Sequence, residues 1–546
     1  MANEFEKSDI SGRDKQIRLS DTRYRIYLLP AILLLMVGAA AFGLRSSKVS
    51  IEQPRPAGRP AKIHPDYCGI VIPPNIAPLN FSIEETGTHY FVKIYCKQGK
   101  TIEVSDRTGN IIIPQSRWRE LLNANRGGKL NFDIFVKTQQ GQWQQFATVT
   151  NTIAQEDIDG YLVYRKIHAG HNVLAEMGIY QRNLTNYDES PVLRNKSFSN
   201  GCVNCHSFCR NRTDNMLLQV RNPGRPSMLL IRNGQVSNVD SRTGFSSKPM
   251  GHAAWHPSGR VIAFALYDVR LFYHTARSEV RDALDRDSAM GYYLVDSKTI
   301  KTTPKLADKE YLETWPCWSA DGRYLYFSRA KKPWTGDKDP IDYYKQLKYD
   351  LVRISYDVNS DRWGEIETVV SGEGAGKSIV LPRISPDGRW LLFCMCNYGA
   401  WSGFQEDSDI YIVDLDAAQK TGKYEYRPFE ANSDKADYWK SWSSNSRWIV
   451  FSSKRDDGMF TKPYFTYIDE NGTAHKPFLL PQKDPAFYDS FMRIYQVPEL
   501  ANEPVPITGE GLAHLIREHL ESPGGFVMTS ATPKAGLETG YGQKPE

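Results

Sequence analysis

The sequence predicts a mainly β protein in which a membrane anchor is followed by a small β-sandwich and a β-propeller. Aromatic residues make up 12% of the 546 residues, and they occur together with 40 Gly and 31 Pro. Such a composition favours strands joined by tight turns. A hairpin pattern also recurs four times between residues 252 and 453, which indicates a repeat architecture.

The N-terminal residues predict a transmembrane helix over residues 26–44, after a cytoplasmic tail over residues 1–25. The stretch "IYLLPAILLLMVGAAAFGL" has no charged residue in 19 positions. As a helix it is about 28 Å long, close to the thickness of the hydrocarbon core of a bilayer. A cleavable signal peptide is the alternative, with "AAA" at 39–41 as the cleavage region.

The charges beside the anchor do not decide its orientation, because six Lys/Arg precede it in residues 1–25 and five follow it in residues 45–64. Residues 45–65 contain four prolines and are expected to form an extended linker.

The region 66–160 alternates apolar and polar positions between turn signals, as in "HYFVKIYC", "NIIIP", "LNFDIFVKT" and "WQQFATVT". These segments predict the strands of a small β-sandwich of immunoglobulin-like type. Residues 161–215 look more helical and are expected to form a separate segment that carries the cysteine motif discussed below.

Four repeats carry the propeller prediction for residues 216–500. Each has an aromatic or apolar lead-in, a turn pair, an Arg and an alternating strand, and successive turns lie 63, 66 and 58 residues apart. The pattern predicts one hairpin per blade with room for two more strands. Residues 217–250 and 459–500 are expected to supply the less regular blades, one of them closed by both chain ends. Residues 501–546 are expected to form a C-terminal helix and a disordered tail. The repeats read as follows: "HAAWHPSGRVIAFALYD", "ETWPCWSADGRYLYFSRA", "VLPRISPDGRWLLFC" and "YWKSWSSNSRWIVFSS".

The repeats "WSADGRYLYFS" and "ISPDGRWLLF" resemble those of TolB-type propellers, the PD40 (WD40-like) family. The stretch "SWSSNSRWIVFSSKRDDGMFTKPYFTYIDENG", with "KPFLLPQKDP" close behind, resembles a group of membrane-anchored bacterial PD40 proteins that carry one haem motif. The likeness extends over roughly residues 70–500. It implies a TolB-like propeller, usually six-bladed, in the bacterial periplasm, and it implies no defined reaction.

The motif "CVNCH" at residues 202–206 matches the attachment pattern of c-type haem. Cys202 and Cys205 would bond the two vinyl groups of one porphyrin, and His206 would be the proximal iron ligand. We therefore expect one covalent haem c. Such haems are attached outside the cytoplasm, so the body of the chain is expected in the periplasm, with the anchor in the inner membrane. A thiol redox pair and a zinc site that uses Cys209 are the alternatives.

The distal iron ligand is not determined by the motif. Met177 and His171 are the preferred candidates, because the 25–30 residues between them and the motif allow the chain to wrap around the porphyrin edge. Further candidates are weaker: His168, Met216, Met228 and His252.

Other signals do not indicate a site. "SGEGAGKS" lacks the first Gly of a P-loop and leads into a strand pattern, so no nucleotide site is expected. A net charge of +5 on 546 residues does not indicate nucleic-acid binding. No catalytic motif is present, so an enzyme is the less favoured reading. Cys68 and Cys96 are left open as a disulfide or as free thiols.

These observations predict a membrane-anchored periplasmic monohaem c-type cytochrome that transfers electrons or docks to a redox partner. Its partner is expected to be a periplasmic or membrane redox protein or an envelope complex. The alternative is a propeller scaffold or assembly factor in which the haem is structural or sensory, including a gas sensor with a vacant iron position.

Overall fold

The computed structural model describes residues 51–169, 176–222, 225–242, 250–274, 279–334, 339–518, 520, 522–523 and 525–528. The chain divides into two units, Met1–Gln53 and Pro54–Glu546, and the following account concerns the second. The predicted tail and anchor over residues 1–44 lie outside the described residues. Within the described residues, no helix is long and apolar enough to cross a membrane.

The first domain contains two sheets that share one core. Phe81 of the smaller sheet packs edge-on against Phe132 of the larger, with ring centroids 6.1 Å apart. The smaller sheet has the order β2-β4-β7 and the larger the order β1-β9-β8-β10-β3, with β5 between β6 and β8. A sandwich is thus present where the alternation predicts it. The strands are β1 (Arg55–Pro56), β2 (Ile63–His64), β3 (Val71–Ile72), β4 (Phe81–Ile83), β5 (His89–Tyr95), β6 (Ile102–Asp106), β7 (Asn110–Ile111), β8 (Lys129–Lys137), β9 (Trp143–Gln145) and β10 (Val149–Ile153).

Two features of this domain differ from the sequence expectation. β1 and β2 pair with β9 and β4, so the second half of the expected linker over residues 45–65 belongs to the sandwich. The domain also contains helix α2 (Gln115–Asn123), which buries Trp118, Leu121 and Leu122 on one face. The spacing i, i+3, i+4 of these residues is the pattern of an amphipathic helix.

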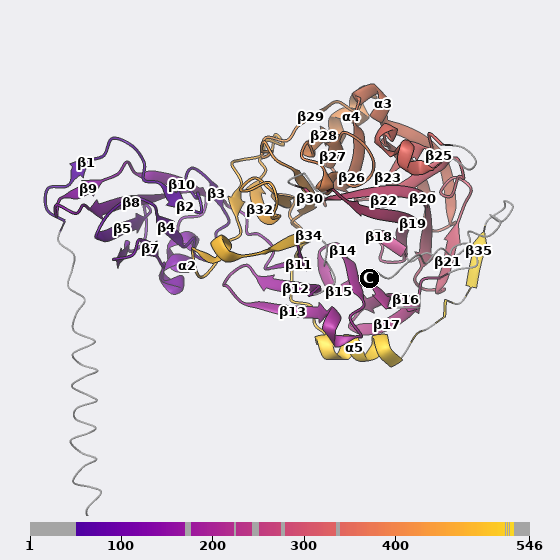
Figure 1. The fold of residues 1–546 in the computed structure, drawn as a ribbon, viewed down its shortest axis with the longest axis horizontal. Helices are drawn as coiled ribbons and strands as arrows, with labels where there is room; N and C mark the ends of the chain where they lie inside the picture. Colours follow the sequence, from indigo (N-terminus) through magenta and orange to yellow (C-terminus); the bar gives the residue numbers. More distant parts are fainter. Residues whose placement is uncertain are drawn as a thin grey trace, which may run out of the picture. The chain divides into compact units, whose positions relative to one another are not determined.

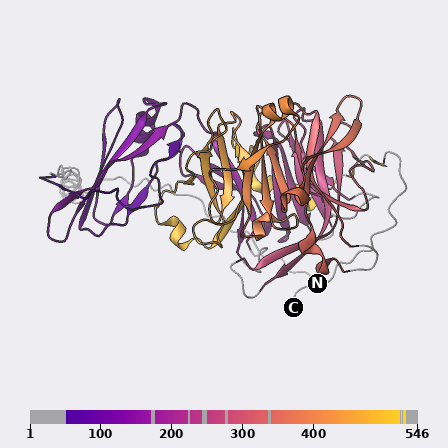
Figure 2. The same cartoon turned by 90° about the horizontal axis from the view of Figure 1, so that it is seen from above.

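Six further sheets, each built on four consecutively paired antiparallel strands, form the second domain of the described chain. Their innermost strands are β34, β14, β18, β22, β26 and β30, and neighbouring innermost strands contact each other in this order until β30 meets β34 again. Figure 1 shows these sheets arranged around a common centre, and Figure 2 shows them at right angles to that view. This closed ring is a β-propeller, as the repeats predict.

The four predicted hairpins are the pairs β18–β19, β22–β23, β26–β27 and β30–β31. Their strands belong to four blades: β18 (Met250–Trp255), β19 (Val261–Tyr273), β20 (Arg281–Leu294), β21 (Thr299–Thr302); β22 (Tyr311–Trp318), β23 (Tyr324–Lys331), β24 (Asp350–Asp357), β25 (Arg362–Val370); β26 (Ser378–Ile384), β27 (Trp390–Cys396), β28 (Asp409–Asp414), β29 (Tyr426–Pro428); β30 (Asp437–Trp442), β31 (Trp448–Ser453), β32 (Lys462–Tyr467), β33 (Phe478–Leu479).

The other two blades include the region expected to be a separate helical segment. One has the order β14-β15-β16-β17, and the other the order β13-β12-β11-β34, so that the C-terminal strand β34 closes the ring against N-terminal strands. The expected boundary at residue 216 is therefore wrong, because the propeller begins at β11. Their strands are β11 (Tyr161–His168), β12 (Gly178–Asn183), β13 (Glu189–Arg194), β34 (Arg493–Ala501), β14 (Cys202–Cys209), β15 (Arg212–Asn222), β16 (Arg225–Arg232) and β17 (Gln235–Asp240).

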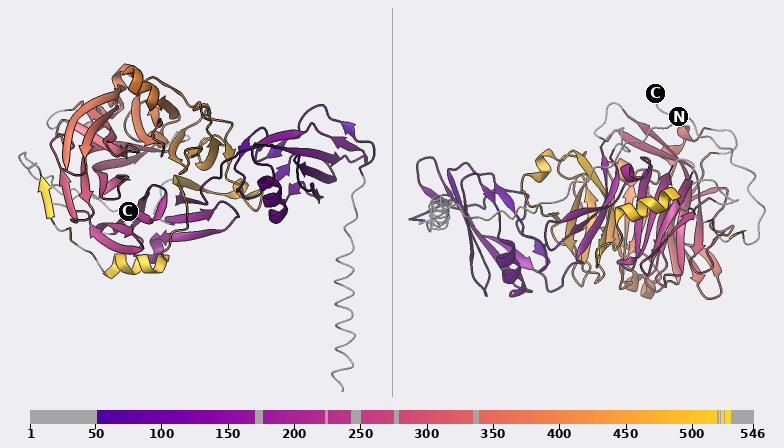
Figure 3. Two further views of the ribbon diagram at one scale, coloured as in Figure 1. Left: turned by 180° about the vertical axis from the view of Figure 1, so that it is seen from behind. Right: turned by 90° about the horizontal axis from the view of Figure 1, so that it is seen from below.

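The C-terminal region contributes a helix and one more strand. Helix α5 (Gly509–Glu518) contacts β13 and β17 and buries Leu512, Ala513 and Ile516 (Figure 3). β35 (Gly525–Met528) adds to the edge of β21 in parallel, in a range that the sequence suggests is disordered. The short helices are α3 (Gly372–Ala375), α4 (Leu415–Thr421), η1 (Asn195–Ser197), η2 (Pro340–Asp342), η3 (Tyr344–Gln346), η4 (Ser402–Phe404) and η5 (Phe487–Ser490).

Candidate cofactor site in the propeller channel

The cysteine motif lies on β14, the innermost strand of its blade. Val203 pairs with Val220 and His206 with Leu218 of β15, so β14 contains one residue more than its partner between these pairs. This is a β-bulge, in which the extra residue is left out of the regular ladder. Asn204 and Cys205 occupy the bulge.

A bulge of one extra residue recurs in all six innermost strands. In the other five it places one residue in the left-handed region, at φ values between 38° and 57°. These residues are His252, Trp315, Leu381, Trp439 and Val497. The motif is thus built into the regular repeat of the propeller.

An apolar cavity of about 360 Å³ lies toward the N-terminal ends of the innermost strands. Cys202 and Asn204 of the motif line it, and so does Met177. The thioether sulfur of Met177 is 3.7 Å from the Sγ of Cys202. Met177, one of the two preferred distal candidates, thus lies beside the first cysteine, although it precedes Cys202 by 25 positions in the sequence. The other, His171, lies outside the described residues.

Aromatic rings that no sequence motif assigns to a site form much of the cavity wall. They come from four blades: Tyr267, Tyr273, Trp315, Trp401, Phe404, Tyr438 and Trp439. The signal that could have located some of them is the aromatic lead-in of the repeats, which supplies Trp315 and Trp439. Because the bulge gives both residues a positive φ, they leave the regular alternation of the strand.

Two arginines hold the middle of the motif. Arg165 Nη1 donates to the Oδ1 of Asn204 at 2.8 Å, and Asn204 Nδ2 donates to the hydroxyl of Tyr267 at 3.2 Å. Arg221 Nη2 also donates to this hydroxyl, at 2.6 Å. Arg165, Arg221 and the buried Arg281 all line the cavity. An apolar cavity with guanidinium groups suits an aromatic ligand that carries acidic groups.

Cys205 and His206 are buried beside the cavity and do not line it. Burial raises the pKa of the Cys205 thiol, and Arg165 and Arg221 partly offset this effect. His206 Nε2 lies 3.2 Å from the carbonyl oxygen of Val163, while its Nδ1 is buried without a hydrogen-bond partner. Burial lowers the pKa of His206 to about 3, so the imidazole is neutral at pH 7 and in the form that ligates metals.

The weaker distal candidates have other roles. Met216 and Met228 are fully buried in the cores between blades. His168 is half-exposed and lies 3.8 Å from Glu176. His252 stacks on Trp315 with ring centroids 3.4 Å apart, and its Nδ1 lies 3.0 Å from the Oγ1 of Thr314.

The chemical groups at the cavity are of the types that a covalent haem requires. One thiol and a thioether face an apolar aromatic cavity, three guanidiniums line it, and a neutral imidazole has an unpartnered nitrogen nearby. For one porphyrin to bond both thiols, Cys205 has to turn toward the cavity. Cys205 lies in the bulge, which is the part of β14 that can move without breaking the ladder on either side.

The alternatives to haem concern a zinc site and the state of the thiols. Within the described residues, no group of three or more His, Cys, Asp or Glu side chains is placed to hold a metal ion. All eight cysteines are free, including Cys68 and Cys96. The two motif thiols are therefore not joined to each other.

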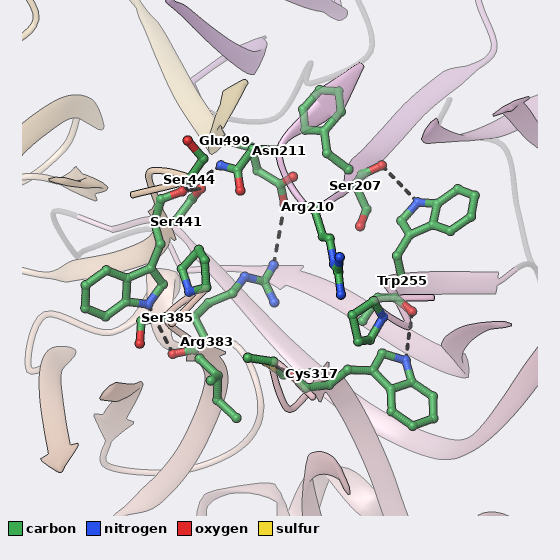
Figure 4. Close-up of a pocket in the computed structure, with 18 of the residues that line it drawn as sticks. Ser207, Arg210, Asn211, Trp255, Cys317, Arg383, Ser385, Ser441, Ser444 and Glu499 are labelled. Carbon is green, nitrogen blue, oxygen red and sulfur yellow. Dashed lines mark hydrogen bonds and ion pairs between the residues drawn. The ribbon is translucent and has the colours of Figure 1, made fainter. Parts of the chain in front are cut away.

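A second pocket, of about 500 Å³, lies toward the C-terminal ends of the innermost strands (Figure 4). Its wall includes Arg210, Arg383, Glu499, several serines and the tryptophans Trp255, Trp318 and Trp442. None of the residues that line this pocket also lines the first cavity. No motif of the sequence indicates this pocket.

Comparisons with known proteins show at most a distant similarity of fold. No protein-family profile and no curated protein matches the chain. Among solved structures, a prolyl endopeptidase is similar with 15% identity and a TM-score of 0.33 over 52% of this chain, which spans only 36% of that enzyme. Oligogalacturonate lyase from Vibrio parahaemolyticus shares 12% identity with a TM-score of 0.32 over 71% of this chain and 100% of that one. Hydrazine synthase of Kuenenia stuttgartiensis shares 10% identity with a TM-score of 0.26 over 49% and 76%. No activity follows for this chain from similarities at this level.

Proposed function

We propose that this chain is a membrane-anchored periplasmic monohaem c-type cytochrome whose TolB-like propeller docks to a redox partner. The observation that carries the proposal is the position of the Cys-x-x-Cys-His motif. Its first cysteine, Cys202, lines an apolar cavity, and the sulfur of Met177 lies 3.7 Å from the Sγ of Cys202. A haem bound there would supply a one-electron couple.

In this proposal Cys202 and Cys205 hold the porphyrin, His206 is the proximal ligand and Met177 is the distal ligand. The chain's own residues, in this proposal, bury the haem and orient it. The tryptophans and tyrosines of the cavity exclude water, and Arg165, Arg221 and Arg281 favour acidic groups at its wall. We assign no catalytic residue.

The propeller suits the docking role because it holds the motif on a closed ring. β14 is paired along its length with β15 and contacts β18 and β34 of the neighbouring blades. A site fixed by three blades changes little when a partner binds, and a rigid site keeps the reorganisation that accompanies electron transfer small.

The test is the pyridine-haemochrome spectrum of the full-length protein, made in a bacterial host that attaches c-type haem. We expect a haem c spectrum that is lost in Cys202→Ser and in Cys205→Ser. Cys96→Ser, which changes a half-buried thiol of the sandwich, is the matched control and is expected to keep the haem. A wild-type protein without covalent haem would overturn the proposal.

The second candidate function is a scaffold or assembly factor for an envelope or cytochrome complex. The observation in its favour is that Cys205 and His206 are buried beside the cavity and do not line it. A redox titration separates the two functions. A reversible couple that exchanges electrons with periplasmic or membrane redox proteins supports the carrier, and a haem that exchanges electrons with none of them supports the scaffold.

A further inference from the structure

The pocket toward the C-terminal ends of the innermost strands has no part in the proposed haem site. Arg383, at the end of β26, and Glu499, on β34, lie close together at its wall, and Arg210 follows β14. In Figure 4 the guanidinium groups of Arg210 and Arg383 are both directed toward the middle of the pocket.

Both guanidinium groups have N–H donors for which no described residue of the protein provides an acceptor. Among the residues that the structure describes, the side chain of Arg383 makes one hydrogen bond, from Nη1 to the carbonyl oxygen of Pro382 at 3.4 Å. Its Nη2 lies 3.7 Å from the Oε1 of Glu499, which is too long for a hydrogen bond. Arg210 is exposed, and no carboxylate within the described ranges forms an ion pair with it. An arginine offers five N–H donors, so most of them remain for a ligand.

Glu499 is a weak counter-ion for these two groups. Its side chain is 13% exposed, and burial raises its pKa to about 7 although Arg383 and the backbone N–H of Phe208 favour the charged form. Other carboxylates beside the pocket are already bonded to its wall: Asp159 accepts from Asn211 and Ser444, Asp321 from Ser319, and Asp387 from Ser385. Among the residues that line the pocket, two arginines thus stand against one carboxylate, that of Glu499.

The rest of the wall favours a ligand with a carbon skeleton. The indole nitrogens of Trp255, Trp318 and Trp442 donate to backbone carbonyls of neighbouring blades, at 3.2, 3.2 and 3.4 Å. Their rings, with Pro257 and Pro386, are left as apolar surface. A volume of about 500 Å³ lies within the range of small-molecule sites, which is roughly 300–1,000 Å³.

We propose that this pocket binds an organic carboxylate, which pairs with the guanidiniums of Arg383 and Arg210. The planar fork of Arg383 matches a carboxylate in a two-bond arrangement, and Glu499 already places one carboxyl group opposite that fork. The carboxylate comes either from a small organic acid or from an acidic segment of a peptide, since both present the same group to the arginines.

The experiment is isothermal titration calorimetry on the full-length protein in detergent, with two probes in separate arms. One probe is citrate, and the other is a tetra-glutamate peptide blocked at both ends. The variants are Arg383→Gln and Arg210→Gln, and the matched control is Arg427→Gln, a half-exposed arginine on the outer strand β29. Because Arg210 is exposed, its variant is expected to fold even if Arg383→Gln does not.

We expect saturable binding of at least one probe, weakened about tenfold or more in each pocket variant because a charge-assisted pair is lost. Arg427→Gln is expected to bind as the wild type does. Binding of citrate alone identifies a small acid as the source of the carboxylate, and binding of the peptide alone identifies an acidic segment. The absence of saturable binding of either probe, or an equal loss in Arg427→Gln, would overturn the proposal.

This result is independent of the haem. Cys205→Ser, which is expected to lack covalent haem, is expected to bind the same probe as the wild type, so failure of one proposal is distinguishable from failure of the other.

Discussion

A buried ion cluster beside the first cavity gives a quantitative test of the packing. Glu279 accepts hydrogen bonds from Lys454 Nζ at 2.5 Å and from the Nε and Nη2 of Arg281 at 2.8 and 2.9 Å. The three side chains are 6%, 3% and 7% exposed. Replacing Glu279 with Gln leaves two buried cations without their anion.

The size of the effect follows from the pKa. Hydrogen bonds and charges of Arg281 and Lys454 outweigh the cost of burial and lower the pKa of Glu279 from 4.5 to about 2. A difference of about 2.5 pKa units is worth ~3.4 kcal/mol of folding stability at pH 7. This agrees with the ~3–5 kcal/mol expected when one partner of a buried pair is removed.

The pH dependence has a defined sign. Because the folded pKa lies below the unfolded one, the stabilisation is complete well above pH 4.5 and is lost as the pH falls toward 2. About 2 kcal/mol of it is lost by pH 3.

The assay is urea unfolding followed by tryptophan fluorescence, at pH 7 and at pH 3. Glu279→Gln is expected to lose ~3–5 kcal/mol at pH 7 and to differ less from the wild type at pH 3. Glu365→Gln, which removes an 86% exposed carboxylate, is the control and is expected to change stability by less than ~0.5 kcal/mol. The reasoning is refuted if Glu279→Gln unfolds within ~1 kcal/mol of the wild type at pH 7.

Three further outcomes are expected. Under the haem proposal, Met177→Ala would open an iron position, so reduced protein is expected to bind carbon monoxide where the wild type does not; an unchanged spectrum under carbon monoxide contradicts Met177 as the distal ligand. Glu499→Gln removes the competing carboxylate from Arg383, so calorimetry at pH 8 is expected to show tighter citrate binding, and weaker binding speaks against the carboxylate pocket. Trp118→Ala removes a fully buried indole and its 3.0 Å hydrogen bond to Ile76, and is expected to destabilise the sandwich by ~3–5 kcal/mol in thermal unfolding; a loss under ~1 kcal/mol contradicts its place in the core.

The hairpins of the propeller could be predicted because their signals are local. The turns after β18, β22 and β26 each hold a Gly with positive φ, at positions 259, 322 and 388. The strands on both sides alternate with the period of a sheet. Nothing beyond the hairpin itself is needed to recognise it.

β11 and the closing strand β34 were harder to recognise because they are buried on both faces. Val163 and Tyr164 point to opposite faces of β11 and are both fully buried. A strand of this kind lacks the alternation that identifies an edge or half-exposed strand. The same burial explains why the residues of β11 look helical in the sequence.

For the candidate site, the sequence names the residues of the motif but not the residues that surround it. The spacing within the motif is local, so Cys202, Cys205 and His206 could be named. The cavity joins side chains that are far apart in sequence, such as Arg165, Tyr267 and Trp439. Their meeting depends on ring closure and on the bulges of the innermost strands, which no short stretch of sequence specifies.

The most direct test is tandem mass spectrometry of the full-length protein purified from a host that attaches c-type haem. The account predicts one haem per chain, bound through two thioether bonds on the peptide that contains Cys202 and Cys205. A peptide with both thiols unmodified in the purified wild-type protein would contradict it.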